Sequence, residues 1–119
     1  MYIALPCFTL AKKTNMYLSQ QEWAKNQKAV SDSVILDVRT AEEFAEGHLP
    51  DAELLDIRNP EEFMKGLEEL EATKTYFVYC RSGARSAQAC QILKQQGIAD
   101  CYNLLGGIIE WQGEITNLI

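Results

Sequence analysis

A cysteine followed by a short polar loop is the feature of this sequence best suited to chemistry. Cys80 comes directly after an apolar run, and Arg81 and Arg85 flank a loop that contains Gly83. We expect the loop, with positive φ at Gly83, to turn backbone N–H groups toward the sulfur. These groups and the two cations favour a thiolate, which is the nucleophilic form of cysteine. The sequence therefore predicts a lowered pKa for Cys80 and sulfur chemistry on an anionic substrate. The candidate substrate-binding residues are Arg81, Ser82, Gly83, Ala84 and Arg85.

The four cysteines of the chain do not have the same interpretation. A cysteine after an apolar strand is, on position alone, more often a buried core thiol, but the polar loop with two arginines favours a functional Cys80. Cys90 on the apolar face of a helix and Cys101 at the start of a buried strand are interpreted as core, and Cys7 carries no pattern. The spacing contains no CxxC pair and no disulfide framework, so we expect reduced cysteines and a cytoplasmic protein.

Short apolar runs alternate with helical patterns along the chain, as they do in a parallel α/β sheet. The predicted strands cover residues 16–18, 34–36, 54–57, 75–79 and 101–104. Helices are predicted to begin at Ser19 and Thr40, each in a capping box, at Asn59 before Pro60, and at Ser86, from which a helix runs to residue 96. Ligands of parallel sheets bind beyond the carboxyl ends of the strands, and Cys80 lies at such an end.

Two sets of apolar side chains outside the loop are interpreted as core. Phe63, Met64 and Leu67 recur at helical spacing with charged residues mostly opposite, and Trp111 lies in a turn near the end of the chain. Neither set carries chemistry of its own.

Three ordered blocks of the sequence resemble the rhodanese-like domain family. The middle block is the loop Cys80-Arg81-Ser82-Gly83-Ala84-Arg85-Ser86. The first consists of Leu36-Asp37-Val38-Arg39, Glu42-Glu43-Phe44 and Gly47-His48-Leu49-Pro50-Asp51-Ala52, and the last of Tyr102-Asn103-Leu104-Leu105-Gly106-Gly107-Ile108 with Trp111. The resemblance as a whole spans about residues 17–111. Asp51 stands where the family usually has a second glycine, a mild change because aspartate tolerates unusual φ in a turn.

The resemblance implies an α/β fold with a five-stranded parallel sheet flanked by helices on both faces. It also implies a sulfurtransferase in which Cys80 attacks thiosulfate or a similar donor and becomes a persulfide. Cyanide or a low-molecular-weight thiol would then accept the sulfur. No metal and no organic cofactor is implied, and the single histidine, His48, belongs to a family turn where packing and hydrogen bonding are expected instead of catalysis.

Supporting roles are expected for Asp37, Arg39 and Ser86. Asp37 and Arg39 end the strand next to Cys80 and are expected to brace the site by hydrogen bonds. Arg81 is expected to project outward, toward a donor or a partner. Arg85 either orients the donor or pairs with a carboxylate such as Glu43 or Asp37.

The chain as a whole predicts one domain, residues 16–119, after an N-terminal arm of residues 1–15. The arm is either loose or lies upstream of a natural start at Met16. The formal net charge of −6 argues against nucleic acid as a partner, and no apolar run approaches the roughly 20 residues that span a membrane.

Two rival functions remain open. The first is a phosphatase or arsenate reductase, and phosphotyrosine-type phosphatases place five residues between cysteine and arginine. Here four residues separate Cys80 from Arg85, which predicts a nest too small for a phosphate ester. The other rival is a sulfur-relay or binding module that passes the persulfide to a partner protein. An inactive scaffold is disfavoured because Cys80 is present.

Overall fold

The computed structural model describes residues 16–118, so the predicted arm of residues 1–15 and Cys7 lie outside the described residues. Within them, parallel strands form one five-stranded sheet in the order β1-β5-β4-β2-β3. The elements in chain order are β1 (Tyr17–Leu18), α2 (Gln20–Ala29), β2 (Ser33–Asp37), α3 (Ala41–Glu46), β3 (Glu53–Leu54), α4 (Pro60–Glu69), β4 (Thr75–Tyr79), α5 (Ala84–Gln95), β5 (Cys101–Leu104) and a 3₁₀ turn, η1 (Ile108–Glu110).

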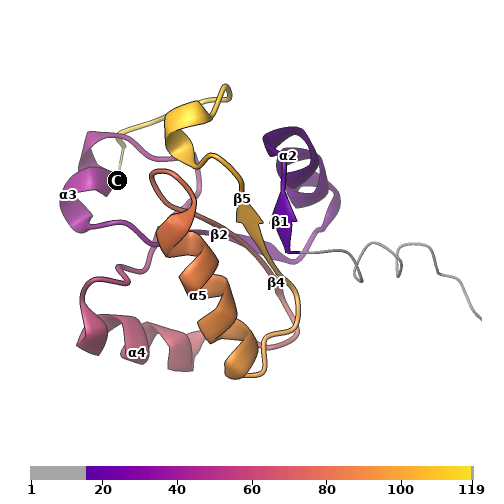
Figure 1. The fold of residues 1–119 in the computed structure, drawn as a ribbon, viewed down its shortest axis with the longest axis vertical. Coiled ribbons are helices and arrows are strands. Elements are labelled where there is room, and N and C mark those ends of the chain that lie inside the picture. Colours follow the sequence, from indigo (N-terminus) through magenta and orange to yellow (C-terminus); the bar gives the residue numbers. More distant parts are fainter. Residues whose placement is uncertain (1–15, 119) are drawn as a thin grey trace, which may run out of the picture.

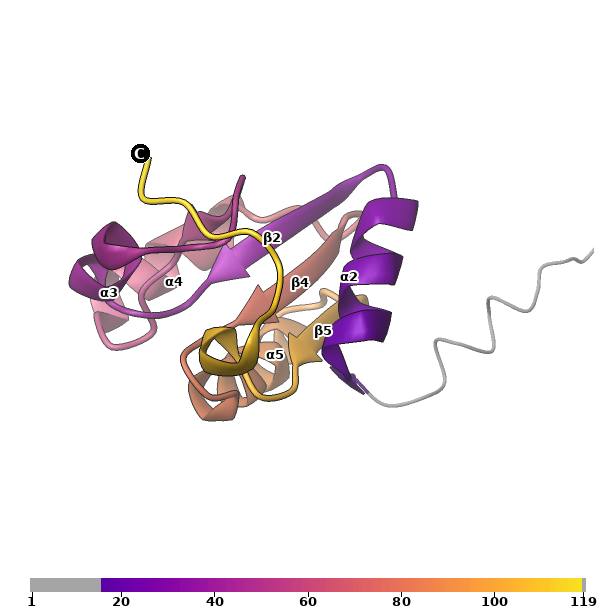
Figure 2. The ribbon, with the colours of Figure 1, turned by 90° about the horizontal axis from the view of Figure 1, so that it is seen from above.

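Helices cover both faces of this sheet, as Figures 1 and 2 show. The alternation of side chains along β4 divides the core between them, because successive residues of a strand point to opposite faces. Tyr76, Val78 and Cys80 pack in the core beneath α4 and α5. Phe77 and Tyr79 pack in the second core, beneath α2 and η1. The expected fold class is thereby confirmed, and Cys80 follows the middle strand on the α5 side.

The predicted helix starts at Ser19, Thr40 and Asn59 are confirmed. The Thr40 cap forms a full capping box, in which the Thr40 side chain accepts from the Glu43 N–H and the Glu43 side chain accepts from the Thr40 N–H. Ser19 and Asn59 each accept one backbone N–H at the start of their helices. Asp51 has φ 67°, in the left-handed region, as expected for an aspartate in this turn.

The predictions for β3 and for the core face of α4 are each wrong in one detail. β3 ends at Leu54 instead of extending through residue 57, although the Leu55 and Ile57 N–H groups still donate to the carbonyls of Asp37, the last residue of β2, and of Val38, which follows it. Met64 is not a core residue, since half of its surface is exposed. Phe63 and Leu67, four positions apart, share the inner face of α4, whereas Met64 lies around the helix from them.

The C-terminal segment is held against the domain by backbone and aromatic contacts. His48 and Thr116 exchange backbone hydrogen bonds at 2.8 Å in an antiparallel bridge. Trp111 is half-buried and meets Trp23 edge-to-face with ring centroids 5.7 Å apart, so its assignment to the core is confirmed in part. None of the helices within residues 16–118 has the length and apolarity that crossing a membrane requires.

Candidate active site

The Cys80 loop is shorter than the sequence predicts, because α5 begins at Ala84 and not at Ser86. Gly83 is the N-cap of the helix, with φ 108°, a conformation that favours glycine. The turn therefore closes within Cys80, Arg81, Ser82 and Gly83, and Ala84 and Arg85 belong to the first helical turn. The consequence is that the free N–H groups of the helix start point back toward Cys80, the residue that follows β4.

The sulfur of Cys80 accepts hydrogen bonds from this helix start. The Gly83 N–H donates to Sγ at 3.1 Å, and the Ser86 hydroxyl oxygen lies 3.3 Å from Sγ. Cys80 and Ser86 are both buried, at 1% and 0% exposure. The sulfur thus lies beneath the loop, in contact with donors that suit a negative charge.

These donors decide the acidity of the thiol. Burial raises the pKa of Cys80, but hydrogen bonds from the Ser86 hydroxyl and from the backbone N–H groups of Ser86, Gly83 and Ser82 lower it, and the lowering prevails. In contrast, the hydrogen bond with Cys101, and then burial, raise the pKa of the Cys90 thiol. Cys80, Cys90 and Cys101 are all free and buried, as expected for the core residues Cys90 and Cys101, and of these three Cys80 is the one placed at a helix start.

Arg85 is held by Glu43, one of the two partners that the sequence suggested. Its guanidinium donates to both carboxylate oxygens of Glu43, Nη1 to Oε1 at 2.8 Å and Nη2 to Oε2 at 3.0 Å. This pair lowers the pKa of Glu43 to about 2, with smaller help from Thr40 against the opposing effect of burial. The attraction is mutual: the Glu43 hydrogen bond raises the pKa of Arg85 most, and the negative charge of Cys80 adds to it. Arg85 therefore joins α5 to α3 beside the sulfur.

Replacing Glu43 with glutamine is expected to remove a stabilising contribution that depends on pH. A carboxylate whose folded pKa is lowered stabilises the fold above its unfolded pKa of about 4.5, and this stability is lost as the pH falls toward 2. The free energy of unfolding of the wild type should exceed that of Glu43→Gln by about 1 kcal/mol at pH 7, after allowance for solvent screening, and by less at pH 3. Urea unfolding at both pH values measures the difference. Glu42→Gln, an exposed neighbour, is the matched control; a Glu43→Gln difference that stays constant with pH would contradict the assignment.

Asp37 and Arg39 brace the sheet from the face opposite Cys80. Arg39 donates to both oxygens of Asp37, at 2.9 and 2.7 Å, and to the Gly47 carbonyl at 2.7 Å. The Tyr79 hydroxyl donates to Asp37 at 2.7 Å and accepts the Leu49 N–H at 3.0 Å. Asp37, Arg39 and Tyr79 thereby pair polar side-chain atoms that burial would otherwise leave without a hydrogen bond. They fix Tyr79, the last residue of β4, and so the starting position of Cys80.

The turn after β5 supports the loop through a close approach that the sequence analysis missed. The Ile108 and Ile109 N–H groups donate to the carbonyls of Cys80 and Arg81 at 3.0 and 3.1 Å. Gly107, just before them, has φ 62°, and a Cβ at this position would overlap the Arg81 carbonyl. The only available signal was the Gly106-Gly107 pair itself, which gives no hint of its long-range neighbour.

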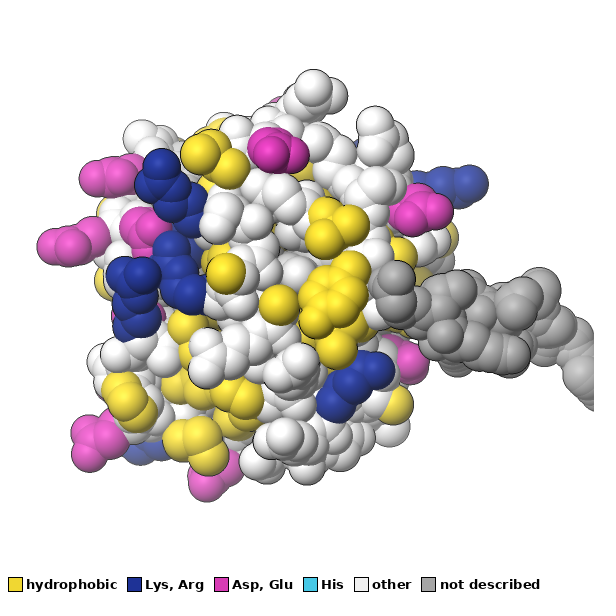
Figure 3. Space-filling view, in the orientation of Figure 1, with side chains coloured by type: hydrophobic (Ala, Val, Ile, Leu, Met, Phe, Trp, Pro, Cys, Tyr) yellow, Lys and Arg dark blue, Asp and Glu magenta, His cyan; other side chains and the backbone are white. Residues whose placement is uncertain are grey.

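The outer surface of the loop is open. Arg81 is exposed, as expected, and so are Ser82 and Ala84. Figure 3, in the orientation of Figure 1, shows Lys and Arg side chains gathered at the left of the molecule, with Asp and Glu side chains beside them. The predicted site residues Cys80 to Ser86 are therefore brought together as one loop and helix start, whereas Asp37 and Arg39 lie behind it. No group of His, Cys, Asp and Glu side chains within residues 16–118 is arranged to hold a metal.

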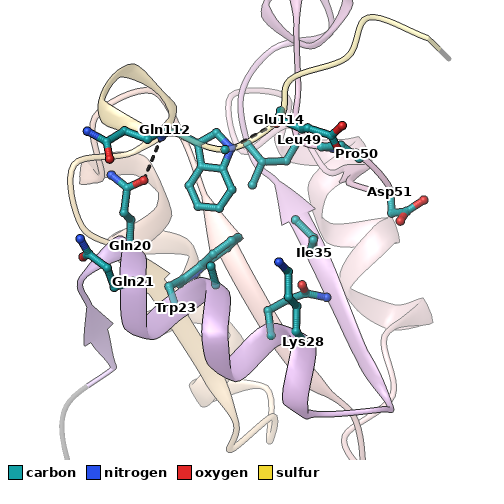
Figure 4. Close-up of a pocket in the computed structure, with 14 residues that line it drawn as sticks. Gln20, Gln21, Trp23, Lys28, Ile35, Leu49, Pro50, Asp51, Gln112 and Glu114 are labelled. Atoms are coloured by element: carbon teal, nitrogen blue, oxygen red, sulfur yellow. Dashed lines mark hydrogen bonds between the residues drawn. The ribbon is translucent and has the colours of Figure 1, made fainter.

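A separate cavity of about 480 Å³ lies between α2 and the C-terminal segment (Figure 4). Trp23, Ile35 and Leu49 line it, and the Gln112 N–H donates to the Gln20 side chain across its edge at 2.9 Å. Its walls belong to the α2 side of the sheet. None of the predicted site residues lines it, so it is distinct from the site at Cys80.

Comparison with known proteins agrees with this fold. The model of the Rhodanese-like domain family matches residues 20–114. A protein of Allochromatium vinosum named "Sulfurtransferase" is 42% identical over 80 residues, which cover 67% of this chain and 72% of that protein. The crystal structure of a rhodanese-like domain protein from Staphylococcus aureus superimposes with a TM-score of 0.72 at 29% identity, covering 84% of this chain and 94% of that one. A rhodanese-related protein from Thermoplasma volcanium gives a TM-score of 0.73 at 27% identity, covering 87% of this chain and 100% of that one. The chain belongs to the rhodanese-like domain family.

Proposed function

We propose that the chain is a sulfurtransferase that carries sulfur as a persulfide on Cys80. The observation that carries this proposal is the buried Cys80 sulfur with the Gly83 N–H at 3.1 Å and the Ser86 hydroxyl at 3.3 Å. The lowered pKa of this thiol and the similarity to the Allochromatium vinosum sulfurtransferase support it. The proposed donor is thiosulfate or a similar anion with a sulfane sulfur, and the proposed acceptor is cyanide or a thiol.

The reaction has two displacements on sulfur. The Cys80 thiolate attacks the outer sulfur of thiosulfate, so that a bond from Sγ to that sulfur forms while the sulfur–sulfur bond of thiosulfate breaks and its electron pair leaves with sulfite. Cyanide or a thiolate then attacks the outer sulfur, and the electron pair of the persulfide bond returns to Sγ as a thiolate. Backbone N–H groups of residues 82, 83 and 86 stabilise the charge before and after turnover. Exposed Arg81 attracts the anionic donor.

Two observations argue against a phosphatase or arsenate reductase at this site. The loop is closed by Gly83, so that the helix starts only four residues after Cys80. The Arg85 guanidinium, which would have to grip phosphate oxygens, donates instead to both oxygens of Glu43. A phosphate ester would therefore have to displace a bidentate ion pair to bind.

A protein acceptor is the second candidate, and exposed apolar residues beside the loop favour it. Leu105 is 49% and Ile109 is 60% exposed. Ile109 lies next to Arg81, to whose carbonyl its N–H donates at 3.1 Å. Apolar side chains beside a reactive centre suit contact with a protein surface more than with a small anion. In this form of the proposal Cys80 performs the same chemistry, and a partner thiol takes the sulfur.

A reducing compartment is part of the proposal, because the described cysteines Cys80, Cys90 and Cys101 are all free thiols. A cytoplasmic setting keeps such thiols reduced and available for sulfur transfer.

A steady-state comparison of three substrates tests the proposed class of reaction. We expect sulfur transfer to cyanide from thiosulfate, less from 3-mercaptopyruvate, and no hydrolysis of p-nitrophenyl phosphate. Phosphate ester hydrolysis without sulfur transfer would overturn the proposal. Transfer from thiosulfate that becomes faster with a protein thiol than with cyanide would favour the protein acceptor.

A further inference from the structure

The Ser86 hydroxyl lies between two acceptors and has one proton to give. Its oxygen is 3.3 Å from Cys80 Sγ and 2.5 Å from Asn103 Oδ1. All three residues are buried, with exposures of 0% for Ser86 and 1% for Cys80 and Asn103, so the hydroxyl is shielded from bulk solvent. At any moment the hydroxyl can donate either to the sulfur or to the amide oxygen.

Asn103 is held so that it presents its oxygen to Ser86. Its Nδ2 donates to the Gly83 carbonyl at 3.2 Å, at the N-cap of α5. Turning the amide over would put Oδ1 against that carbonyl and Nδ2 against Ser86, which would lose the Gly83 hydrogen bond. The position of Asn103 in β5, two residues after Cys101, therefore fixes an acceptor beside the hydroxyl that serves the sulfur.

We infer that Asn103 is a positioning residue that accepts the hydrogen bond of the Ser86 hydroxyl whenever the Cys80 sulfur is uncharged. When Sγ is a thiolate, the hydroxyl turns to the sulfur, and the Asn103 oxygen loses a hydrogen bond. When Sγ is a thiol, the hydroxyl donates to Asn103 and can accept a hydrogen bond from the S–H group. Asn103 thereby opposes ionisation, and the acidity of Cys80 reflects the competition between the two acceptors.

The consequence for turnover rests on the proposed function. In a persulfide, the inner sulfur Sγ has two covalent bonds and no charge, so the Ser86 hydroxyl returns to Asn103. When the acceptor removes the outer sulfur, Sγ becomes a thiolate again and the hydroxyl turns back to it. The hydroxyl follows the charge on Sγ, and no proton or electron leaves Ser86 in either position.

Other charged and titratable groups lie on the loop itself and on the elements packed around it, and they must be the same in each variant that is compared. They are Arg81 in the loop, Arg85 with Glu43 between α5 and α3, Asp37 with Arg39 and Tyr79 behind the sheet, Glu110 in η1, and Cys90 with Cys101 between α5 and β5. None of them is altered by a substitution at Asn103. A change in the acidity of Cys80 in such a variant therefore reports on Asn103 and on the groups that it contacts.

The test is the acid dissociation constant of Cys80, measured from the pH dependence of its alkylation by iodoacetamide with peptide mass spectrometry. Asn103→Leu removes the amide acceptor, so the Ser86 hydroxyl can donate only to the sulfur. The acid dissociation constant of Cys80 should then rise about tenfold. Asn103→Asp keeps an acceptor, adds negative charge and also loses the Gly83 hydrogen bond, so the constant should fall. In a Ser86→Ala background, Asn103→Leu should leave the constant unchanged, because the hydroxyl through which Asn103 acts is absent.

A purely structural role for Asn103 gives a different pattern. Both substitutions would then loosen the Gly83 end of the loop and lower the constant, with or without Ser86. That result, or no change in Asn103→Leu, would overturn the inference, as would a rise that persists in the Ser86→Ala background. Circular dichroism checks folding, and Asn103→Ala, which adds no bulk, must give the same sign as Asn103→Leu. Because no sulfur donor is present, the result stands apart from the sulfurtransferase proposal.

Discussion

Cys80→Ser is expected to abolish sulfur transfer and to leave the fold intact. A serine hydroxyl is not ionised near neutral pH and cannot form a persulfide, so turnover should fall at least about a thousandfold. The serine oxygen is close in shape to the thiol and can still accept from the Gly83 N–H, which donates to Sγ at 3.1 Å. The free energy of unfolding should therefore change by only about 1 kcal/mol.

The measurement is thiosulfate-dependent transfer to cyanide, together with urea unfolding of the same samples. Cys90→Ala is the matched control, because Cys90 is equally buried but lies on the inner face of α5, beyond its first turn. It should lose some stability and keep its activity. Sulfur transfer retained by Cys80→Ser, with a fold like that of the wild type, would refute the assignment of Cys80 as the nucleophile.

Gly107→Ala, in the turn after β5, is expected to lower activity strongly by displacing the Cys80 loop. Gly107 has φ 62° and ψ −166°, a combination that is almost confined to glycine and costs about 1–3 kcal/mol for other residues. The added Cβ would also overlap the carbonyl of Arg81, so the loop that holds the sulfur must move. A displacement of about 1 Å can cost about a hundredfold in rate, and we expect a loss of that size in kcat/KM.

Gly97→Ala is the control that tests backbone strain alone, without displacement of the Cys80 loop. Gly97, after α5, also has a positive φ, 96°, but an added Cβ there meets no atom within 4 Å. This variant should lose about 1 kcal/mol of stability and keep full activity. Equal losses of activity in Gly97→Ala and Gly107→Ala would show that general destabilisation, and not the position of the Cys80 loop, explains the effect.

Local signals predicted the parts of the molecule that depend on neighbours in sequence. The β-branched and aromatic residues of β4 favour a strand, and the caps at Thr40 and Asn59 satisfy N–H groups three residues away. The placement of Cys80 after the middle strand follows from the alternation of strands and helices. The start of α5 was missed by two residues because Gly83 can end a loop or cap a helix, and the sequence alone does not distinguish the two.

Contacts between distant residues were predicted less well: Glu43 and Asp37 were suggested as alternative partners of Arg85, and no contact was suggested between Ser86 and Asn103. Glu43 and Arg85 are 42 positions apart, and Ser86 and Asn103 are 17 apart. Asn103 left one faint signal, because it is a polar residue that shares a face with Cys101 in a strand otherwise suited to burial. Its partners emerge only when β5 is placed beside β4, under the first turn of α5.

The most direct measurement is the mass of the chain after treatment with thiosulfate, followed by peptide mapping without a reducing agent. The proposal predicts one added sulfur atom, located on Cys80, and none on Cys90 or Cys101. Subsequent cyanide should return the chain to its original mass. An unmodified Cys80 after treatment, or added sulfur on a different cysteine, would contradict the proposal that Cys80 carries the sulfur.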